Sequence, residues 1–475
     1  MSRFSPFLGL IHPLDTVICV IASDRKAKRV GTALLVVDGT DEDLNRKAEI
    51  SLFPGRVKAR SLSRLVSLSR EVYNATVQHR RDAWRLARVT VSRFDEFNEI
   101  PGLRALRPDV AAFGNQFVRG SISRADEAFG ALFRRLGDGE TPGYPRFKSQ
   151  RRFRTTFYDE PVGWSLRGLD GDHPALYVQG VGEIPLSPGA RRQLQRFIRR
   201  GGEPRTLTIT KTRSGAWRAC IGFRNVAPRP LAANDQVGGV DRGITVTAAL
   251  SDGTLLSMPG FLAEARDEIA ALQREREHTQ KFGPEWKKLN RKIAKVDKRS
   301  HNRSENWARH TAIEIVSRYG VIAIEALKLS NMTKSASGTK ENPGTNVAAK
   351  RGLNRSLRDA ALSSLAHWIY VRAEEAGRRV YKVDPRNSSR ECASCGHTEA
   401  ANRKISRFAC RRCGHGEHAD VNAAQVIAAR GQCADAIWVA SGSPRLTRPI
   451  PRNRRRKTES TEQYGAGSAP HARVA

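Results

Sequence analysis

The fold of this chain is decided by two short stretches, Cys392-Ala-Ser-Cys395-Gly and Cys410-Arg-Arg-Cys413-Gly. Two Cys-x-x-Cys motifs at this separation can bring four thiolates around one tetrahedral Zn²⁺. The glycine after each motif permits the tight backbone turn that such a motif needs. Redox chemistry is the alternative for a Cys-x-x-Cys motif, but two matched copies around a short polar insert favour a metal. The sequence therefore predicts a structural zinc ribbon with ligands Cys392, Cys395, Cys410 and Cys413.

Directly after this motif, Asp420 opens the helical run 421–430. An aspartate at a helix start can be only an N-cap, and for Asp420 taken alone that interpretation stays open. A functional role for Asp420 is supported by two further carboxylates, which lie on apolar strands. Asp241 lies in the run Val237–Leu250 among glycines, where a turn aspartate is the alternative. Glu325 ends the apolar run Val321–Glu325, and an ionisable group there is costly unless a partner compensates its charge.

If these three carboxylates converged, they would form a hard-oxygen site suited to Mg²⁺. Two such ions about 3.5–4 Å apart clamp the attacking water and the leaving oxygen of a phosphodiester. The sequence contains no P-loop, dinucleotide-binding fingerprint or Ser/His/Asp pattern that would favour another chemistry. We therefore predict metal-dependent phosphodiester chemistry at Asp241, Glu325 and Asp420.

Composition points to a polyanionic partner. The chain has 475 residues and a formal net charge of +34, a surplus that favours binding to nucleic acid because neutralised phosphates release condensed counterions. A membrane partner is disfavoured, because the apolar stretch 8–22 is interrupted by His12, Pro13 and Asp15 and is too short to span a bilayer. A secretory signal is not indicated either. The remaining cysteines show no disulfide pattern, so a reducing compartment is expected.

The segment 141–158 alternates aromatic and basic side chains. Aromatic rings can stack on bases while the cations contact phosphates, a combination typical of nucleic-acid binding. If the segment is a strand with one buried face, the aromatic rings are instead core residues, and both interpretations can hold at once. The predicted nucleic-acid-binding residues are Tyr144, Arg146, Phe147, Lys148, Arg151, Arg152 and Arg154.

Periodicity predicts the neighbouring elements. Apolar residues at helical spacing predict a bundle over 61–136. Short alternating runs over 47–60 and 137–235 predict a β-rich, barrel-like module. Asp252-Gly253 joins two alternating runs and predicts a hairpin. A charged stretch from Glu264 to about Tyr319 predicts a long helical segment.

Four features together resemble the split RuvC-like nuclease of the TnpB family, transposon-encoded RNA-guided DNA endonucleases related to compact type V CRISPR effectors. These are Val-Asp241-x-Gly-Ile, Ile-Glu325-x-Leu, Asp420-Val-Asn-Ala-Ala and the four-cysteine ribbon before the last of them. The resemblance covers roughly residues 47–433. His418 stands where the family often has an acidic residue, and Ser388 replaces a common threonine. Neither change removes an expected metal ligand.

The resemblance implies an α+β multidomain protein. Its parts would be a RuvC-like, RNase H-like α/β nuclease domain with an inserted zinc ribbon, and an N-terminal β-barrel-like module that carries a helical bundle. The implied boundaries are a possible disordered extension (1–46), the β-module (47–60 and 137–235), the bundle (61–136), the nuclease domain (236–390 and 419–433), the ribbon (391–418) and a basic, disordered tail (434–475).

On family grounds, guide RNA and target double-stranded DNA are the expected partners, with no membrane partner. Asp241, Glu325 and Asp420 would hold catalytic Mg²⁺ or Mn²⁺, and zinc would be structural. The bundle and β-module would recognise a short duplex motif and hold the guide–target heteroduplex. The expected location is the cytoplasm of a prokaryote, at the nucleoid. A DNA-strand transposase and a guided DNA-binding protein without cleavage are the alternatives to an RNA-guided endonuclease.

Overall fold

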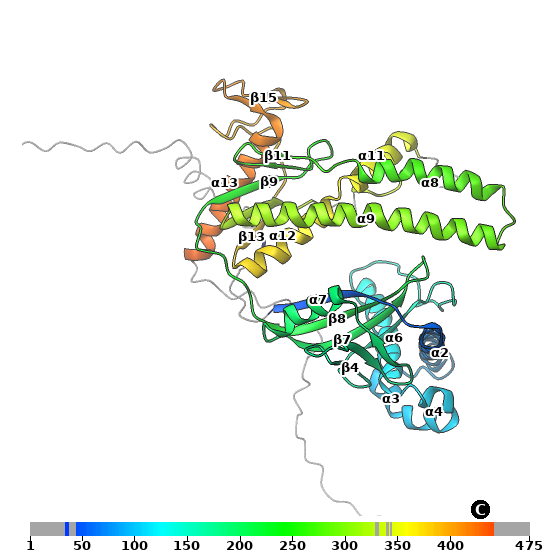
Figure 1. The fold of residues 1–475 in the computed structure, drawn as a ribbon. Coiled ribbons are helices and arrows are strands. Elements are labelled where there is room, and N and C mark those ends of the chain that lie inside the picture. Colours follow the sequence, from blue (N-terminus) through cyan, green and yellow to red (C-terminus); the bar gives the residue numbers. More distant parts are fainter. Residues whose placement is uncertain (1–33, 38–43, 328–331, 339–341, 343, 441–475) are drawn as a thin grey trace, which may run out of the picture.

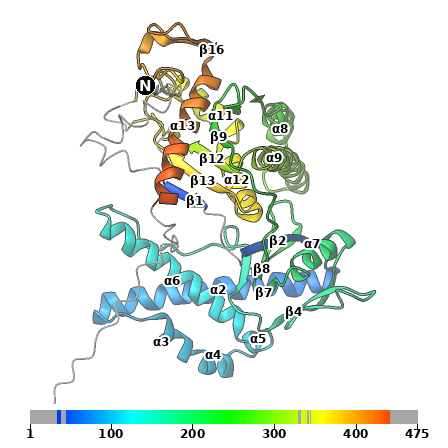
Figure 2. The same cartoon turned by 90° about the vertical axis from the view of Figure 1, so that its left-hand side faces the viewer.

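A computed structural model of the chain describes residues 34–37, 44–327, 332–338, 342 and 344–440 (Figure 1). Residues 1–33 and 38–43 of the expected extension, and residues 441–475 of the expected tail, lie outside the described residues. The described elements form two modules, one built around a six-stranded sheet and the other around two smaller sheets and a helical bundle (Figure 2). Among the described residues, no helix is both long and apolar enough to cross a lipid bilayer.

The larger sheet has the strand order β1-β13-β12-β9-β10-β11. Its three central strands, β13, β12 and β9, are parallel, and the outer strands pair antiparallel. Central parallel strands are covered on both faces and therefore tolerate continuous apolar runs such as Val321–Ile324. The bounds are β1 (Leu34–Val37), β9 (Val237–Asp241), β10 (Ala248–Leu250), β11 (Leu255–Leu256), β12 (Val321–Glu325) and β13 (Arg379–Val383).

Helices cover both faces of this sheet. Alternate residues of β12 point to opposite sides, so Ile322 packs with helices α9 (Pro284–Arg318) and α12 (Leu362–Ala376), whereas Ala323 packs with Ile427 of α13 (Ala419–Ala440). A further helix of this module, α11, spans Val347–Asp359. The sheet is thus the middle layer of a three-layer arrangement, with α13 on the face opposite α9 and α12.

Two glycines allow α13 to lie directly on the sheet. A Cβ atom on Gly239 of β9 would stand 1.9 Å from the Ala424 carbonyl oxygen of α13. A Cβ atom on Gly431 of α13 would stand 2.4 Å from the Cβ atom of Ala323 in β12. These close approaches fix the height of α13 above β9 and β12, and with it the position of the residues at the start of the helix.

We expect Gly239→Ala to destabilise the protein by about 1–3 kcal/mol, because the new methyl group meets backbone atoms that cannot rotate away. The matched control is Gly130→Ala in a bundle helix, where a Cβ atom meets nothing within 4 Å. Alanine should be neutral there or stabilise by about 0.5–1 kcal/mol. Chemical denaturation of both variants measures the difference. Equal stability of the Gly239→Ala and wild-type proteins would show that α13 is not held at this distance.

The long charged stretch is helical, as the sequence predicted, and it is divided into two helices. Helix α8 (Phe261–Glu277) and helix α9 lie antiparallel, side by side, in both views (Figure 1, Figure 2). The chain reverses at residues 278–283, where Phe282 has a positive φ of 69° and Pro284 begins α9. Proline disfavours a helical conformation in the residue before it and is well suited to a helix start. Gly283-Pro284 was therefore a break signal that the charge pattern concealed.

The hairpin predicted at Asp252-Gly253 is present. Strands β10 and β11 pair antiparallel, and Gly253 has the positive φ of 92° that its turn requires. The run expected as one strand, Val237–Leu250, is instead divided into β9 and β10, which pair with each other. Asp241 is the last residue of β9, so it lies at a strand end.

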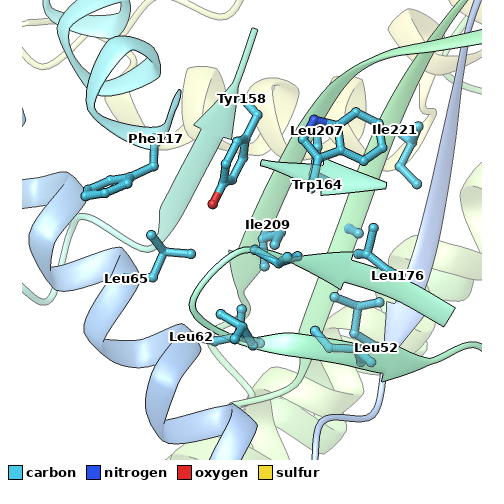
Figure 3. Packing of buried hydrophobic residues seen from close by; sticks show 14 of the residues in the cluster. Leu52, Leu62, Leu65, Phe117, Tyr158, Trp164, Leu176, Leu207, Ile209 and Ile221 are labelled. Atoms are coloured by element: carbon cyan, nitrogen blue, oxygen red, sulfur yellow. The ribbon is translucent and has the colours of Figure 1, made fainter. Parts of the chain in front are cut away.

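The smaller module contains two antiparallel sheets, β2-β8-β7-β3 and β4-β5-β6. Both sheets share one apolar core with helix α2 (Arg56–Ala87), in which Leu62 and Leu65 of the helix face the sheets (Figure 3). In the described part of the chain the two sheets pair separately, and the expected barrel is not confirmed. The bounds are β2 (Leu44–Leu52), β3 (Thr155–Tyr158), β4 (Trp164–Arg167), β5 (Ala175–Val178), β6 (Gly182–Pro185), α7 (Pro188–Ile198), β7 (Glu203–Lys211) and β8 (Trp217–Val226).

The helical bundle expected over 61–136 is present, with α2 starting a little earlier. Helix α2 packs on α6 (Gln116–Gly137) through a second apolar cluster that includes Tyr73, Val77 and Phe129. Three short helices, α3 (Arg93–Asn98), α4 (Ile100–Leu106) and α5 (Pro108–Ala111), connect them. The bundle therefore presents the polar faces of two long helices beside the β-sheets.

The N-terminal segment differs from the expected separate extension through residue 46. Residues 34–37 form edge strand β1, in which Leu34 pairs with Lys382 of β13. Residues 44–46 already belong to β2, in which Leu44 pairs with Val226 of β8. Each segment satisfies backbone hydrogen bonds by pairing along the edge of its sheet.

Candidate functional site

The larger sheet brings two of the predicted carboxylates to the same edge. Strands β9 and β12 are parallel neighbours, and Val240 pairs with Ile324. Asp241 and Glu325 are the next residues of the two strands, and each ends its strand. Both side chains therefore lie at the carboxyl edge of the sheet, where ligand sites of open α/β sheets are commonly found.

Asp420, near the N-terminus of α13, lies close to this edge because α13 packs on β9 and β12. Burial, followed by the charges of Glu325 and Asp420, raises the pKa of Asp241 to about 7. The structure thus brings the three predicted carboxylates into one electrostatic environment. Among the described residues, their oxygens are less tightly clustered than the four cysteine sulfurs, whose donor atoms all lie within 4.8 Å of one another.

Glu325 is buried and oriented by a hydroxyl group. The Ser388 Oγ donates a hydrogen bond of 2.6 Å to Glu325 Oε1. Burial raises the pKa of Glu325, while the Ser388 hydrogen bond and nearby arginines oppose that shift. Ser388, which replaces the threonine common in the resembling family, therefore keeps the hydroxyl function at this position.

Arg242 follows Asp241 in the chain and is buried, and the sequence analysis gave it no role. Its guanidinium donates to the Glu325 carbonyl at 2.7 Å and to the Leu362 carbonyl at 3.0 Å. It therefore ties the end of β12 to the start of α12 beside the carboxylates. Burial lowers the pKa of Arg242, and nearby acidic groups counteract this effect. Direct adjacency to Asp241 was the one signal in the sequence for this residue.

Arg403 supplies a cation to the carboxylates from the cysteine-rich segment. Its Nη2 lies 2.7 Å from Asp420 Oδ1. Its charge also opposes the upward pKa shifts of Asp241 and Glu325. The segment inserted before α13 is therefore part of the site's electrostatics. Sequence analysis missed this contact, because an arginine between two cysteine motifs carries no spacing signal.

The four cysteines form the cluster predicted from their spacing. Cys392 Sγ lies 3.7 Å from Cys413 Sγ, and Cys395 Sγ lies 3.6 Å from Cys410 Sγ. Sulfur atoms about 2.3 Å from a tetrahedral zinc lie ~3.8 Å apart, so this arrangement fits Zn²⁺. The segment's strands are β14 (Arg403–Lys404), β15 (Arg407–Ala409) and β16 (Gly416–His418).

The turns of the cluster use the two predicted glycines. Gly396 and Gly414 have positive φ values of 72° and 75°, and each donates its N–H to the carbonyl of the first cysteine of its motif. The four donor atoms come from two matched loops, as the sequence predicted. The cluster is therefore a zinc-binding site with the architecture of a zinc ribbon.

Two buried asparagines fix the cluster in place. Asn402 accepts a hydrogen bond from the Arg411 N–H at 2.9 Å and donates to the Arg390 carbonyl at 3.0 Å, so it connects the two cysteine loops. Asn422 accepts from the Ala393 N–H at 2.9 Å and donates to the Glu391 carbonyl at 2.7 Å. Because Asn422 is two residues after Asp420, the cysteine cluster and the start of α13 are positioned together.

The aromatic and basic segment 141–154 is irregular in structure, and strand β3 begins only at Thr155. Asn74 of α2 holds the segment by accepting from the Lys148 N–H at 2.8 Å and donating to the Lys148 carbonyl at 3.0 Å. Some aromatic residues of the segment are packed in the core, and others are exposed and available for stacking. Phe153 packs on Tyr73 with ring centres 5.8 Å apart, whereas the Phe147 side chain is 46% exposed.

Tyr144 combines both roles, since it packs edge-on against Phe129 with ring centres 5.4 Å apart and is still 43% exposed. The basic residues of the segment lie mostly on the surface. The exposed cations among the predicted nucleic-acid-binding residues are Arg146, Lys148, Arg151 and Arg152, and Arg154 is half-buried.

Two family models match the chain. The model described as "Probable transposase" matches residues 222–336, which include Asp241 and Glu325. The model described as "Cas12f1-like, TNB domain" matches residues 363–427, which include the four cysteines and Asp420. The two matches together cover the cysteine cluster and every strand of the larger sheet except β1.

The chain is also similar to two bacterial proteins. "Putative RNA-guided DNA endonuclease InsQ" of Escherichia coli (strain K12) is 30% identical over 338 residues, which cover 70% of this chain and 79% of that protein. "Putative RNA-guided DNA endonuclease" of Streptomyces pristinaespiralis is 25% identical over 420 residues, which cover 83% of this chain and 91% of that protein.

In three dimensions the chain is similar to the protein in a cryo-EM structure of a Cas12f1–sgRNA–target DNA complex. The TM-score is 0.51 at 12% identity, over 82% of this chain and 99% of that chain. Fold and cysteine cluster define the class, a multidomain α+β protein with a Cas12f-like fold. The chain belongs to the TnpB family of transposon-encoded RNA-guided DNA endonucleases. The resemblance identified from the sequence is confirmed.

Proposed function

We propose that this protein is an RNA-guided DNA endonuclease that hydrolyses phosphodiester bonds at Asp241, Glu325 and Asp420. The observation that carries the proposal is the convergence of these carboxylates at the carboxyl edge of the larger sheet, where the charges of Glu325 and Asp420 help to raise the pKa of Asp241. Family membership and the names of both bacterial relatives support the same activity. The larger sheet with its helices would be the RuvC-like nuclease domain.

The carboxylates have the chemistry of a divalent-cation site. In the described part of the chain, the Asp241 side chain has no hydrogen-bond donor or ion-pair partner, so both of its oxygens are free to bind a cation. Buried carboxylates of like charge need a compensating cation, and Mg²⁺ or Mn²⁺ prefers such oxygen ligands. A bound metal would supply Lewis-acid activation of water and stabilise charge on the reacting phosphate.

The neighbouring side chains prepare these ligands. Ser388 fixes the rotamer of Glu325 through its short hydrogen bond, and Arg242 fixes the backbone on which Glu325 stands. Arg403 holds Asp420 through Nη2 and is itself held by a hydrogen bond from Nε to the Ile405 carbonyl. Ser388 contacts Glu325 and Arg403 contacts Asp420 in the absence of substrate. These two carboxylates are therefore pre-organised and lose little conformational freedom when they bind metal.

Guide RNA and target double-stranded DNA are the proposed partners, with sequence choice supplied by base pairing rather than by the protein. The net charge of +34 supports polyanion binding. The bundle and the β-module would hold the heteroduplex and read a short duplex motif, with contacts from the segment 144–154. Such a protein would work in the cytoplasm of a prokaryote, at the nucleoid.

The decisive experiment sequences the RNA that copurifies with the protein and then offers the protein a DNA duplex that matches that RNA. A discrete structured RNA and guided cutting in Mg²⁺ support the proposal. DNA-strand joining in place of hydrolysis would instead identify a transposase. Guided binding without cutting, from protein with intact carboxylates, would identify a DNA-binding protein and contradict the endonuclease proposal.

Nucleic-acid affinity should fall steeply with salt. Each duplex phosphate that the protein neutralises contributes roughly −0.9 to the slope of log affinity against log salt concentration. A groove lined by many of the chain's cations should therefore give a slope of about −6 or steeper. Fluorescence anisotropy over a salt series measures it. A slope near −1 would mean that the charge is not organised into a nucleic-acid groove.

A further inference from the structure

A pocket of about 500 Å³ lies between helix α2, helix α6 and the chain that leads into β3. Tyr73 comes from α2, Arg124 from α6, and Phe153 from the connecting segment. The cations that line the pocket are Arg124, Lys148, Arg152 and Arg154. Glu127 is the one carboxylate among its lining residues. This is a strongly cationic pocket at the junction of the bundle and the β-module.

Arg124 is the deepest of these cations, and burial lowers the pKa of its guanidinium. The side chain is held by a hydrogen bond to Thr155 Oγ1 and by the Phe157 ring, whose centre lies 5.4 Å from the guanidinium carbon. Among the residues that the structure describes, Arg124 forms no ion pair, and Glu127 on the next turn of α6 lies beyond ion-pair distance. The guanidinium is therefore fixed in position without a counter-ion.

Arg80 in the same bundle illustrates the contrast. Arg80 is fully buried where Arg124 is half-buried, and its guanidinium nitrogens lie 2.7 Å from Glu96 Oε2 and 2.7 Å from Asp126 Oδ1. A charge removed from water without a partner costs free energy, so proteins normally pair buried arginines in this way. Arg124 has the burial without the pairing. No anion from the described part of the chain pairs with the Arg124 guanidinium, so this position can accept an anion from another molecule.

The other three cations are equally available. Within the described ranges, Lys148, Arg152 and Arg154 form no ion pair with a carboxylate. The backbone of Lys148 is fixed by the two hydrogen bonds of Asn74, so the rim of the pocket is held in place as well as its floor. Four cations thus line one pocket. Contacts within the protein hold the Arg124 side chain and the Lys148 backbone in place without a ligand.

We propose that this pocket binds a backbone phosphate of a nucleic-acid strand, with Arg124 as its buried anchor. The inference rests on the proposed function and adds to it one site at which the bundle binds the nucleic-acid strand. A guanidinium offers paired N–H donors that match two phosphate oxygens. Among the described residues these donors are not paired with Glu127, the one carboxylate that lines the pocket. The phosphodiester group is common to the guide RNA and the target DNA, and the experiment distinguishes these sources.

The test measures the salt dependence of binding for Arg124→Gln and Arg152→Gln in the full-length protein. The probes are a short RNA, the same sequence as single-stranded DNA, and the corresponding duplex DNA. Loss of one phosphate contact should make the slope shallower by roughly 0.7 for a single strand or 0.9 for a duplex. Arg124→Lys keeps the charge and should recover most of the wild-type slope.

The matched control is Arg135→Gln, a change on the same helix at an exposed arginine that is 2.6 Å from Glu140. It should leave the slope unchanged. Because Arg124 is half-buried, thermal unfolding of each variant is measured first. If Arg124→Gln unfolds, the exposed Arg152 variant carries the test.

A slope change with the RNA probe alone identifies the guide as the strand in the pocket, and a change with a DNA probe alone identifies the target. Either result supports the phosphate site. Wild-type slopes on every probe for the folded variants would overturn it. That outcome leaves the endonuclease proposal intact if guided cutting is observed. Conversely, altered slopes in a protein that never cuts would contradict only the endonuclease proposal.

Discussion

DNA cutting is expected to disappear when any one of Asp241, Glu325 or Asp420 is replaced, while RNA and target binding stay near the wild-type level. We expect Asp241→Ala, Glu325→Gln and Asp420→Ala each to lower the cutting rate by about a thousandfold or more. Each side chain is proposed to hold metal rather than nucleic acid, so its loss removes stabilisation of the transition state and leaves ground-state binding. The measurement is guided cleavage in Mg²⁺ or Mn²⁺, with binding followed in parallel.

The three losses should not add, because the ligands act as one unit, and the triple variant should be about as inactive as each single variant. Asp252→Asn is the matched control. Asp252 is a carboxylate in the β10–β11 turn of the same sheet, where it pairs with Arg318 at 2.8 Å. Its replacement should leave cutting at the wild-type level. Full cutting by Glu325→Gln would remove that residue from the site.

Zinc loss is the second large effect. Cys392→Ser combined with Cys395→Ser should abolish zinc binding and unfold the chain around residues 384–420. Structural zinc sites contribute on the order of 10–16 kcal/mol of folding free energy in small zinc-binding units. Cutting should fall too, because Arg403 and Asn422 link the cysteine cluster to Asp420. Metal analysis and hydrogen exchange measure the two effects.

Cys433→Ser is the control for this experiment. Cys433 lies in α13, is half-buried and does not belong to the four-cysteine cluster. Its replacement should leave about one Zn²⁺ per chain and normal protection from exchange. Wild-type protein that is purified under reducing conditions and contains no zinc would contradict the zinc assignment.

The parts of the site that could be predicted from sequence are those with a local pattern. Cys-x-x-Cys spacing identified the zinc cluster, and an acidic residue at the end of an apolar strand identified Glu325. Asp241 and Asp420 could be predicted as site residues only from the set of three carboxylates and from the family resemblance. Taken alone, Asp241 could be a turn aspartate and Asp420 an N-cap. The convergence of all three depends on β9 and β12 being neighbours, which follows from the sheet order rather than from any local pattern.

Contacts between distant segments could not be predicted in this way. Arg403 reaches Asp420 because the cysteine cluster folds over the start of α13, and Arg242 reaches the Glu325 carbonyl across two strands. Arg403 is not distinguished from the chain's many other arginines by its neighbours in sequence, and the one sequence signal for Arg242 is that it follows Asp241. Arg124 is similar, since its burial without a partner appears only when α6 packs beside β3.

Local rules also competed with one another. In the stretch 264–319 the helical charge pattern outweighed Gly283-Pro284, and the structure has a break there. In segment 141–154 the sequence leaves open whether each aromatic residue is in the core or exposed, and packing separates Phe153 from Phe147. Both cases are decided by tertiary contacts that the sequence pattern does not contain.

The position of the cysteine cluster between Glu325 and Asp420 has a consequence for protein synthesis. A ribosome delivers Asp241 and Glu325 first, then the four cysteines, and Asp420 only afterwards. A nascent or truncated chain that ends before α13 would contain the complete bundle and β-module and could bind RNA. It would lack Asp420 and would therefore not be expected to cut DNA. If the protein is the proposed endonuclease, we expect it to be inactive until Asp420 has been synthesised and the four cysteines have bound zinc.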